Sequence, residues 1–325
     1  MPIRAAGFGE EGRRQVKCHR WGLFLLVCLL LAGAARRPAA APPAATDAVS
    51  PQVDLLAIGD WEYREGNPPT TARAMPDYVA ARNHPFQAAL LLGDNFHLHL
   101  KEGKEPQLGT IFEATYDPKR LHLPFYALFG NHDCESNNMR IEMAYAKEHP
   151  DSRWRLPARW YRVDLPAKTP VVTILMLDSN KSEMSSKEWQ AERQWMENEL
   201  GKPRGTWTLC AAHHPLFSNG THGDGGRLQK EWGTILKKYR VDFYLCGHDH
   251  VLEHLEIDGW PASFLVVGGG GGRLRADGNG DHGPFSRSSL GFAHLAFDRR
   301  QARVRFVDGR GSTVHEFVRQ AQRDR

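Results

Sequence analysis

Five apolar stretches of this chain each end abruptly in residues that include Asp, Asn or His. The segments that follow the five stretches are Gly59-Asp60, Gly93-Asp94-Asn95, Gly130-Asn131-His132-Asp133, His213-His214-Pro215 and Gly247-His248-Asp249-His250. Continuous apolar runs of this length are typical of buried strands. Open α/β sheets bind ligands at the carboxyl ends of their strands. The pattern therefore predicts an α/β fold with one site assembled from strand ends.

Helical and strand patterns continue between and after these stretches. Apolar residues at helical spacing predict helices over 71–83, 186–200 and 228–239. Beyond residue 250 the pattern changes to short strands without long helices between them, at 264–267, 291–297 and 304–307. This arrangement favours a layered sandwich with a second run of strands at its C-terminal end.

The first 52 residues have a different character from the rest. A basic region from Arg13 to Arg20 precedes an apolar run from Trp21 to Leu31, and small residues follow up to Ala35. This order predicts a secretory signal peptide at residues 1–35, and the Ala- and Pro-rich residues 36–52 predict a tether. We expect a folded domain at 53–325, secreted or periplasmic, without a stable membrane span after cleavage. An uncleaved anchor is the alternative, although the run is short of the roughly 20 apolar residues that span a bilayer.

Charge and cysteine content limit the function classes. Residues 1–37 carry seven Lys or Arg and two Glu, a net +5, whereas the whole chain is +4, which leaves −1 for residues 38–325. The sequence therefore gives no argument for nucleic acid as a partner. The expected mature chain keeps Cys134, Cys210 and Cys246, so at least one thiol is unpaired. Because none has CxxC spacing, we do not interpret them as zinc ligands.

The strand ends offer a mixed set of metal ligands. The candidate donors are Asp60, Asp94, Asn131, His213, His248 and His250. Carboxylate, amide and imidazole donors together suit Fe, Zn or Mn better than Ca or Mg. The set is too large for one tetrahedral ion and large enough for two ions that share a carboxylate, which is an arrangement found in phosphatases.

At this point the chain resembles a known family. The strand-end motifs, from Gly59-Asp60-Trp61 to Gly247-His248-Asp249-His250, are similar to the metallophosphoesterase signature. The likeness is closest to small single-domain purple, or tartrate-resistant, acid phosphatases and runs from Val53 to the C-terminus. It implies a four-layer α/β/β/α sandwich, two metal ions (iron paired with iron, zinc or manganese) and a small phosphorylated substrate. We expect a monomer.

The resemblance also implies roles for individual residues. One metal would be held by Asp60, Asp94 and His250, and the second by Asp94, Asn131, His213 and His248. His132 matches a phosphate-contacting histidine of the family, and His222 matches a second one that contacts phosphate or protonates the leaving oxygen. Asp133 and Asp249 are expected to orient neighbouring side chains. The glycine-rich residues 268–272 are expected to be a closely approaching backbone segment beneath the metals.

Two positions depart from the family pattern. The family's colour comes from a tyrosinate three residues after the bridging aspartate, and this chain has His97 there. Ordinary metallophosphoesterases have a histidine two residues after the first aspartate, and this chain has Glu62. His97 is therefore a candidate metal ligand, and its alternative role is to line the pocket. Without a phenolate ligand, the protein is expected to be colourless.

These observations together predict an acid-phosphatase-like enzyme. The expected reaction is hydrolysis of a phosphate monoester by metal-bound hydroxide, with His132 and His222 as catalytic residues. One alternative is a phosphodiesterase or nucleotidase on the same scaffold. Another is a catalytically weak protein that binds metal or phosphate. His84 and His122 lie outside the motifs and are expected to be ordinary surface or core residues.

Overall fold

The computed structural model describes residues 52–61, 70–100, 105–275 and 280–322. The predicted signal peptide lies outside the described residues, as do Glu62 and the predicted tether except for Gln52. Within the described ranges, no helix has the length and apolar character needed to cross a membrane.

The first sheet combines a parallel half with an antiparallel half. From edge to edge it runs β14 (Thr313–Gln320), β13 (Gln301–Asp308), β12 (Gly291–Phe297), β1 (Val53–Ile58), β2 (Ala88–Leu91), β3 (Phe125–Ala127) and β4 (Trp154–Arg155). Strands β1 to β4 are parallel to one another, whereas β12 to β14 pair antiparallel. Strands β1 and β2 are buried along their full length, in agreement with their continuous apolar sequence.

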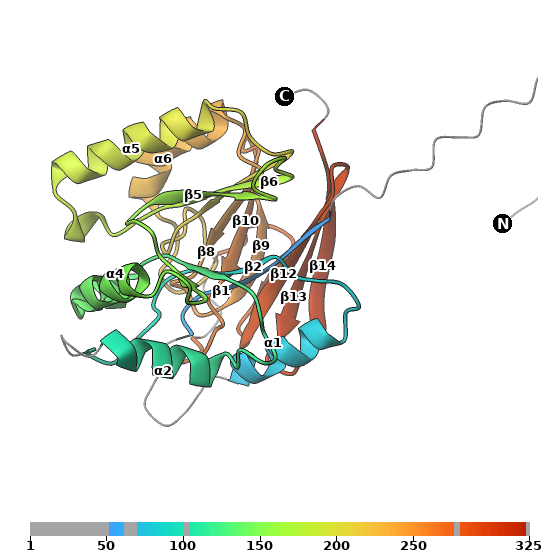
Figure 1. Ribbon diagram of the computed structural model, residues 1–325. Coiled ribbons are helices and arrows are strands. Elements are labelled where there is room, and N and C mark those ends of the chain that lie inside the picture. The colour runs from blue at the N-terminus through green and yellow to red at the C-terminus, as the bar shows by residue number, and fades with distance from the viewer. Residues whose placement is uncertain (1–51, 62–69, 101–104, 276–279, 323–325) are drawn as a thin grey trace, which may run out of the picture. The chain divides into compact units, whose positions relative to one another are not determined.

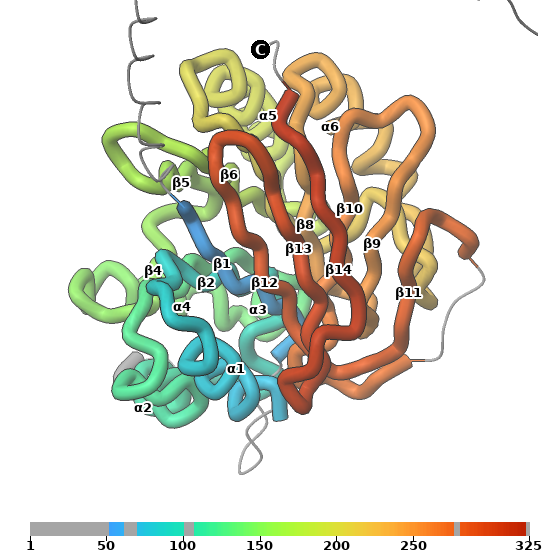
Figure 2. The backbone as a smooth tube through the Cα atoms, turned by 90° about the vertical axis from the view of Figure 1, so that its right-hand side faces the viewer, coloured from blue at the N-terminus to red at the C-terminus, as the bar shows by residue number. Residues whose placement is uncertain are grey.

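The second sheet has its own parallel centre. It runs β11 (Phe285–Arg287), β9 (Leu252–Glu256), β10 (Ser263–Val267), β8 (Phe243–Cys246), β7 (Trp207–Ala211), β6 (Val172–Met176) and β5 (Tyr161–Leu165). Strands β10, β8, β7 and β6 are parallel, and antiparallel strands close both edges. In Figure 2, β14 of the first sheet lies beside β9 and β10, where Arg319 Nη1 donates to Ser263 Oγ at 2.8 Å.

Helices cover the outer faces of both sheets (Figure 1). The helices are α1 (Thr70–Ala80), α2 (Glu105–Thr115), α3 (Asn131–Glu135), α4 (Asn138–Glu148), α5 (Ser186–Leu200) and α6 (Gly226–Lys238), with a 3₁₀ turn at Lys181–Glu183. The Tyr78 ring of α1 packs edge-on against Phe292 of β12, and the Phe112 ring of α2 packs against Phe125 of β3.

A separate core lies between the second sheet and helices α5 and α6. It contains Trp189 and Met196 of α5, Trp232 of α6, and Tyr244 of β8. A larger core fills the space between the two sheets and beneath α1 and α2. The four layers predicted from the sequence are therefore confirmed.

Most predicted elements match the structure apart from their boundaries, but helices α2, α3 and α4 and several strands were not predicted. Helix α5 and strand β12 have the predicted limits, whereas α1 ends at Ala80 because the following residues turn, with Arg82 N–H bonded to Val79 O. Strands β4, β5, β6, β9, β11 and β14 were not predicted. The cysteines among the described residues, Cys134, Cys210 and Cys246, are free, and Cys210 stands opposite Tyr244 rather than Cys246.

The strand ends that carry the polar motifs belong to two sheets, not one. Strands β1, β2 and β3 lie in the first sheet, and β7 and β8 lie in the second. A backbone hydrogen bond joins the two sheets near these ends, because Gly59 N–H donates to Val267 O of β10 at 2.8 Å. Within the first sheet, Asp60 N–H donates to Gly93 O at 2.9 Å and joins the turns after β1 and β2. The motifs therefore converge at one end of the sandwich.

Candidate metal centre

Short turns after the strands direct the candidate ligands toward one another. Asp60 follows β1, Asp94 follows β2, and His248 follows β8, and all three have left-handed backbone conformations with φ of 55°, 51° and 70°. Residues other than glycine rarely adopt this conformation, and it is concentrated at functional sites. The turns are held in place because His248 N–H donates to Asp60 Oδ2 at 2.9 Å.

The structure brings Asp60, Asp94 and His213 into one buried group. One ligand-type atom from each lies within 4.8 Å of the others. His213 Nε2 lies 3.4 Å from Asp94 Oδ2 and 3.2 Å from Asn131 Oδ1. His248 Nδ1 lies 3.2 Å from the same nitrogen. Three predicted donors thus lie within 3.4 Å of His213 Nε2, and the carboxylate of Asp60 lies close by.

His250 joins the group from the side of Asp60. Its Nε2 lies 3.6 Å from Asp60 Oδ1, and its Nδ1 lies 2.7 Å from the backbone oxygen of Arg273. Similarly, His213 Nδ1 lies 2.9 Å from Leu92 O. A carbonyl accepts only from a protonated nitrogen, so both rings carry a proton on Nδ1, and Nε2 is the nitrogen available to a metal ion. Backbone carbonyls therefore orient these two candidate ligands.

The two carboxylates inside the motifs orient other groups. Asp133 accepts the backbone N–H of Asn95 at 2.9 Å and that of Gly130 at 2.8 Å, which fixes two of the site-forming turns. Asp249 Oδ1 lies 2.8 Å from His222 Nδ1. Both carboxylates thus orient neighbours as expected, although neither contacts the ring nitrogens of His213 or His250.

His97 and His132 lie together on another side of Asp94. Ligand-type atoms of Asp94, His97 and His132 lie within 4.8 Å of one another, and the two rings are 4.1 Å apart at their centroids. His132 N–H donates to Asp94 Oδ1 at 3.0 Å, while its partly exposed ring faces the site 3.9 Å from Asp94 Oδ2. Residue 97 is therefore within reach of the group, and its role as a ligand remains a prediction.

His222 lies at the rim of the site and contacts an arginine that the sequence did not indicate. Its ring is 4.1 Å from that of His248 and one-third exposed. Arg275 Nη1 donates to His222 Nε2 at 3.0 Å. Arg275 was missed because it is 53 residues away in the chain and lies in a segment without a recognisable motif. It adds a positive charge beside the expected phosphate position.

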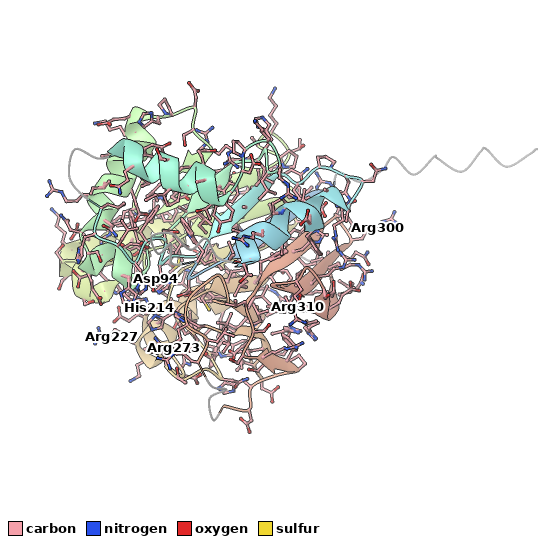
Figure 3. The ribbon with its side chains drawn as sticks, turned by 90° about the horizontal axis from the view of Figure 1, so that it is seen from below. Asp94, His214, Arg227, Arg273, Arg300 and Arg310 are labelled. Carbon is pink, nitrogen blue, oxygen red and sulfur yellow. The ribbon has the colours of Figure 1, made fainter. Side chains whose placement is uncertain are left out.

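A second residue missed as a site component is His214. Its ring is 4.4 Å from that of His248, and its Nδ1 lies 2.8 Å from Ser179 Oγ. Burial and then the charge of His213 lower the pKa of His214 to about 3, so the ring is neutral at ordinary pH. Figure 3 labels His214 next to Asp94, with Arg273 on the same side of the domain. The tandem His213-His214 was the available sequence signal.

The side chain of Asn95, the third residue of the Gly93-Asp94-Asn95 turn, has a structural role. Its Oδ1 accepts from Trp61 Nε1 at 3.0 Å, and its Nδ2 donates to Leu128 O at 3.1 Å and to Glu142 Oε2 at 3.2 Å. The side chain thus ties the turns after β1, β2 and β3 to helix α4. A fully buried amide with these partners fixes the backbone that carries Asp94.

Opposite pKa shifts show that the pocket stabilises positive charge. Burial by itself raises the pKa of Asp94, but the charge of His213 and a hydrogen bond with it hold that pKa at about 2. Burial lowers the pKa of His213, whereas the charges of Asp94 and Asp60 raise it to about 10. The carboxylates of Asp94 and Asp60 therefore favour a protonated His213 ring. The same negative charge would favour a bound metal cation.

The glycine-rich segment lies directly beneath this group, as predicted. Gly270 N–H donates to Gly59 O at 3.0 Å, and Gly272 N–H donates to Asp60 O at 2.9 Å. A Cβ atom on Gly270 would lie 2.2 Å from Gly59 O. A side chain at this position would therefore separate the segment from the turn that carries Asp60.

The donor set fits a pair of transition-metal ions. Asp60, Asp94 and His213 are almost completely buried, and they combine hard oxygen with borderline nitrogen donors. Asn131 and His248 add donors beside His213, and His250 adds one beside Asp60.

Comparisons with known proteins agree with this arrangement. A model of the calcineurin-like phosphoesterase family matches residues 53–252. The chain is 28% identical over 298 residues to tartrate-resistant acid phosphatase type 5 of Sus scrofa, which covers 82% of this chain and 86% of that protein.

Two solved structures share the fold. GAP50, the anchor in the inner membrane complex of Plasmodium, superposes with a TM-score of 0.71 and 18% identity, covering 84% of this chain and 90% of that one. Purple acid phosphatase PPD1 from yellow lupin seeds has a TM-score of 0.64 and 17% identity, covering 83% of this chain and 54% of that one.

Proposed function

Because this chain belongs to the calcineurin-like phosphoesterase family, we propose that it is an exported, metal-dependent phosphatase that hydrolyses phosphate monoesters. The observation that carries the proposal is the convergence of buried Asp60, Asp94 and His213, with His132 and His222 at the accessible rim. The similarity to an acid phosphatase supports the same substrate class. Export rests on the N-terminal sequence, and a mature protein that still begins at Met1 would contradict it.

We assign the ligands as the resemblance implies. Asp60, Asp94 and His250 would hold one ion, and Asp94, Asn131, His213 and His248 would hold the other. His97 would complete the first set in place of the family's tyrosine. When bound, the ions would supply Lewis acidity toward the phosphoryl oxygens and lower the pKa of water.

The chain's own residues would position the phosphate and protonate the leaving group. His132 is fixed through its backbone N–H to Asp94, so its ring is directed to the place where a phosphoryl oxygen would bind. His222 has its Nδ1 held by Asp249, which fixes the tautomer and stabilises the imidazolium form. Its Nε2 accepts from Arg275 in the present structure. For the acid role, Arg275 would turn toward the phosphate and Nε2 would take up the proton that it then delivers.

The leaving-group role of His222 predicts a substrate-dependent loss. In His222→Gln, kcat for an alkyl phosphate is expected to fall about 10²–10⁴-fold, because an alkoxide needs a proton as it leaves. Turnover of p-nitrophenyl phosphate should fall much less, because its phenolate leaves without a proton. Steady-state kinetics on both substrates check this, with exposed His122→Gln as the matched control. Equal losses on both substrates would contradict the acid role.

The identity of residue 97 predicts the colour of the protein. An iron-loaded preparation of the wild type should lack an intense visible band, because His97 offers no phenolate. The His97→Tyr variant should gain one, since residue 97 is within reach of Asp94. Absorption spectra of the two iron-loaded proteins check this without any measurement of activity. An intense band in the wild type would contradict the prediction of a colourless protein, and no new band in the variant would contradict the assignment of residue 97 as a ligand.

The choice of a monoester is tested by comparing two substrates under the same conditions. We expect p-nitrophenyl phosphate to be hydrolysed with a higher kcat/KM than bis(p-nitrophenyl) phosphate. The reverse order would replace the proposal with a phosphodiesterase. Tight binding of inorganic phosphate without turnover of either substrate would indicate a binding protein.

A further inference from the structure

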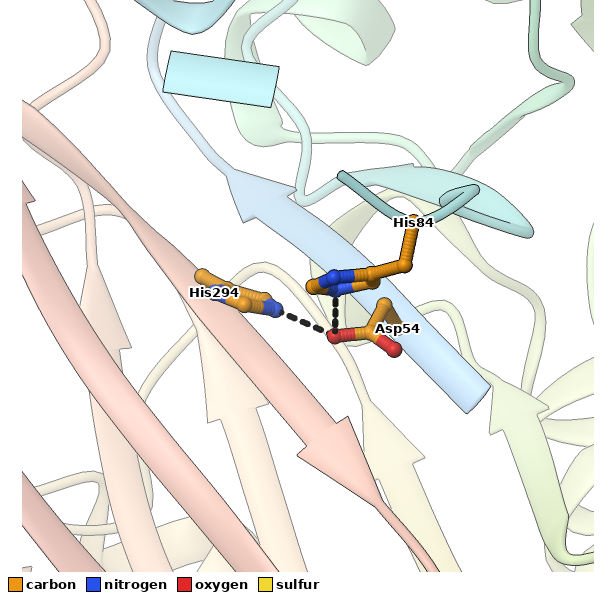
Figure 4. Close-up of side chains that lie close together, drawn as sticks. All are labelled: Asp54, His84 and His294. Atoms are coloured by element: carbon orange, nitrogen blue, oxygen red, sulfur yellow. Dashed lines mark hydrogen bonds and ion pairs between the residues drawn. The ribbon is translucent and has the colours of Figure 1, made fainter. Parts of the chain in front are cut away.

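A second cluster of possible metal ligands lies outside the site at the strand ends. It consists of Asp54 on β1, His84 in the turn after α1, and His294 on β12 (Figure 4). Asp54 Oδ1 lies 2.9 Å from His84 Nε2 and 2.7 Å from His294 Nε2. Asp54 lies at the start of β1, whereas Asp60 follows its end, so the two sites are at opposite ends of this strand and at most about 20 Å apart at ~3.3 Å per residue.

The carboxylate of this cluster is almost fully buried, although it lies within an otherwise apolar strand. The side chains of Asp54 and His294 are 2% and 1% exposed, whereas that of His84 is 36% exposed. Burial of a carboxylate is costly unless charge or hydrogen bonds compensate for it. Here two imidazole edges converge on one oxygen, and Gln52 Nε2 donates to the other at 2.8 Å. The cluster is thus open to solvent on the His84 side.

Neighbouring side chains hold both rings with Nε2 directed at Asp54. The Tyr78 hydroxyl lies 3.0 Å from His294 Nδ1. At metal sites, the second ring nitrogen of a ligand histidine commonly contacts an oxygen in this way, which orients the ring. The Phe86 ring packs 4.7 Å from His294 and stacks on His84 at 5.6 Å. When a cation replaces the proton on His294 Nε2, the proton can occupy Nδ1, where the Tyr78 oxygen accepts it.

We propose that Asp54, His84 and His294 bind a divalent transition-metal ion, with Zn²⁺ as the best match. One carboxylate oxygen and two imidazole nitrogens leave a fourth tetrahedral position for water. Ligand atoms around tetrahedral zinc are about 3.3 Å apart, given bonds of ~2.0–2.1 Å. The two present distances from Asp54 Oδ1 therefore have to widen by a few tenths of an ångström. His84, in an exposed turn, has the freedom to move.

The surroundings leave space for the water ligand. A cavity of about 210 Å³ adjoins the cluster and is also lined by Gln301 and Asp298. Arg303 and Arg305 line the same cavity and would repel a cation, but both donate to Glu316, which offsets part of their charge. A bound ion would connect β1, β12 and the turn at His84, so its expected role is to stabilise the sandwich rather than to act on substrate.

The test compares the zinc content of the wild type and His84→Gln after zinc loading and desalting. Glutamine retains a donor for Asp54 but removes the imidazole ligand, and His84 is exposed enough for the variant to fold. The wild type is expected to retain one more zinc ion per chain than His84→Gln. Zinc should also raise the midpoint of thermal unfolding more in the wild type. Exposed His122→Gln, the matched control, should behave as the wild type in both measurements.

Two outcomes would overturn the proposal. One is equal zinc content in the wild type and in His84→Gln, with both proteins folded by circular dichroism. The other is an additional ion that binds only at millimolar zinc, which would indicate weak surface binding. Phosphatase activity of His84→Gln should equal that of the wild type under saturating metal. The difference in zinc content does not depend on the proposed phosphatase function, because the wild type and His84→Gln have identical residues at the strand-end site.

Discussion

Replacement of Asp94 by asparagine is expected to reduce phosphatase turnover by about 10³-fold or more. Loss of a residue that only orients a metal ligand typically costs 10–100-fold, so loss of a ligand shared by both proposed ions should cost more. Asp94 is the residue common to the group with Asp60 and His213 and the group with His97 and His132. Removal of its charge should also lower the metal content of the purified protein.

This variant separates a chemical effect from misfolding. Asparagine has a similar shape and can still accept the backbone N–H of His132 through Oδ1. The far-ultraviolet circular dichroism spectrum should therefore be unchanged. Asp77→Asn is the matched control, because Asp77 is an exposed carboxylate that pairs with Arg120. An Asp94→Asn protein that retained more than a tenth of the wild-type turnover and its metal content would contradict the bridging role.

Introduction of a single methyl group at Gly130 is expected to damage the site without altering any candidate ligand. A Cβ atom there would lie 2.0 Å from Asp94 Oδ1 and 2.2 Å from Asp94 N. The turn that carries Asp94 would have to move because the contact involves its backbone. Forced overpacking of this kind costs about 1–3 kcal/mol of unfolding free energy. Turnover of Gly130→Ala should fall more than about 100-fold, since small misplacements of reacting groups are costly.

Chemical denaturation and steady-state kinetics of Gly130→Ala check both parts of this prediction. Gly226→Ala at the start of α6 is the matched control, because a Cβ atom there has no neighbour within 4 Å. Its unfolding free energy should be unchanged or higher by about 0.4–1 kcal/mol, since alanine restricts the unfolded chain. Wild-type stability and turnover in Gly130→Ala would show that the Asp94 turn has another conformation compatible with function.

The strand ends could be predicted because their signals are local. Each buried strand is a short apolar run, and the residue types that follow it are those that bind metals. Helix α5 was equally clear, since Trp189, Met196 and Leu200 recur at helical spacing, and the structure buries all three. The assignment of strands to two sheets could not be predicted. Strands buried on both faces have no alternation that would indicate which layer they join.

Contacts between segments that are distant in the chain could not be predicted from the sequence either. Asp54 contacts a histidine 240 residues away, and this pairing depends on the register that places β12 beside β1. His84 was expected to be an ordinary surface or core residue because its neighbours in the chain form no motif. Arg275 beside His222 is a third example, since nothing in its own segment indicates phosphate chemistry. Such sites are produced by sheet topology rather than by local pattern.

The most direct test of the central claim is the rate of p-nitrophenyl phosphate hydrolysis by the metal-depleted mature protein. The protein would be reconstituted separately with iron, zinc and manganese, with Asp94→Asn treated in parallel. We predict negligible turnover without metal, recovery with at least one of these ions, and no comparable recovery in Asp94→Asn. Turnover that is independent of added metal, or equal in Asp94→Asn, would contradict a metal-dependent phosphatase centred on this residue.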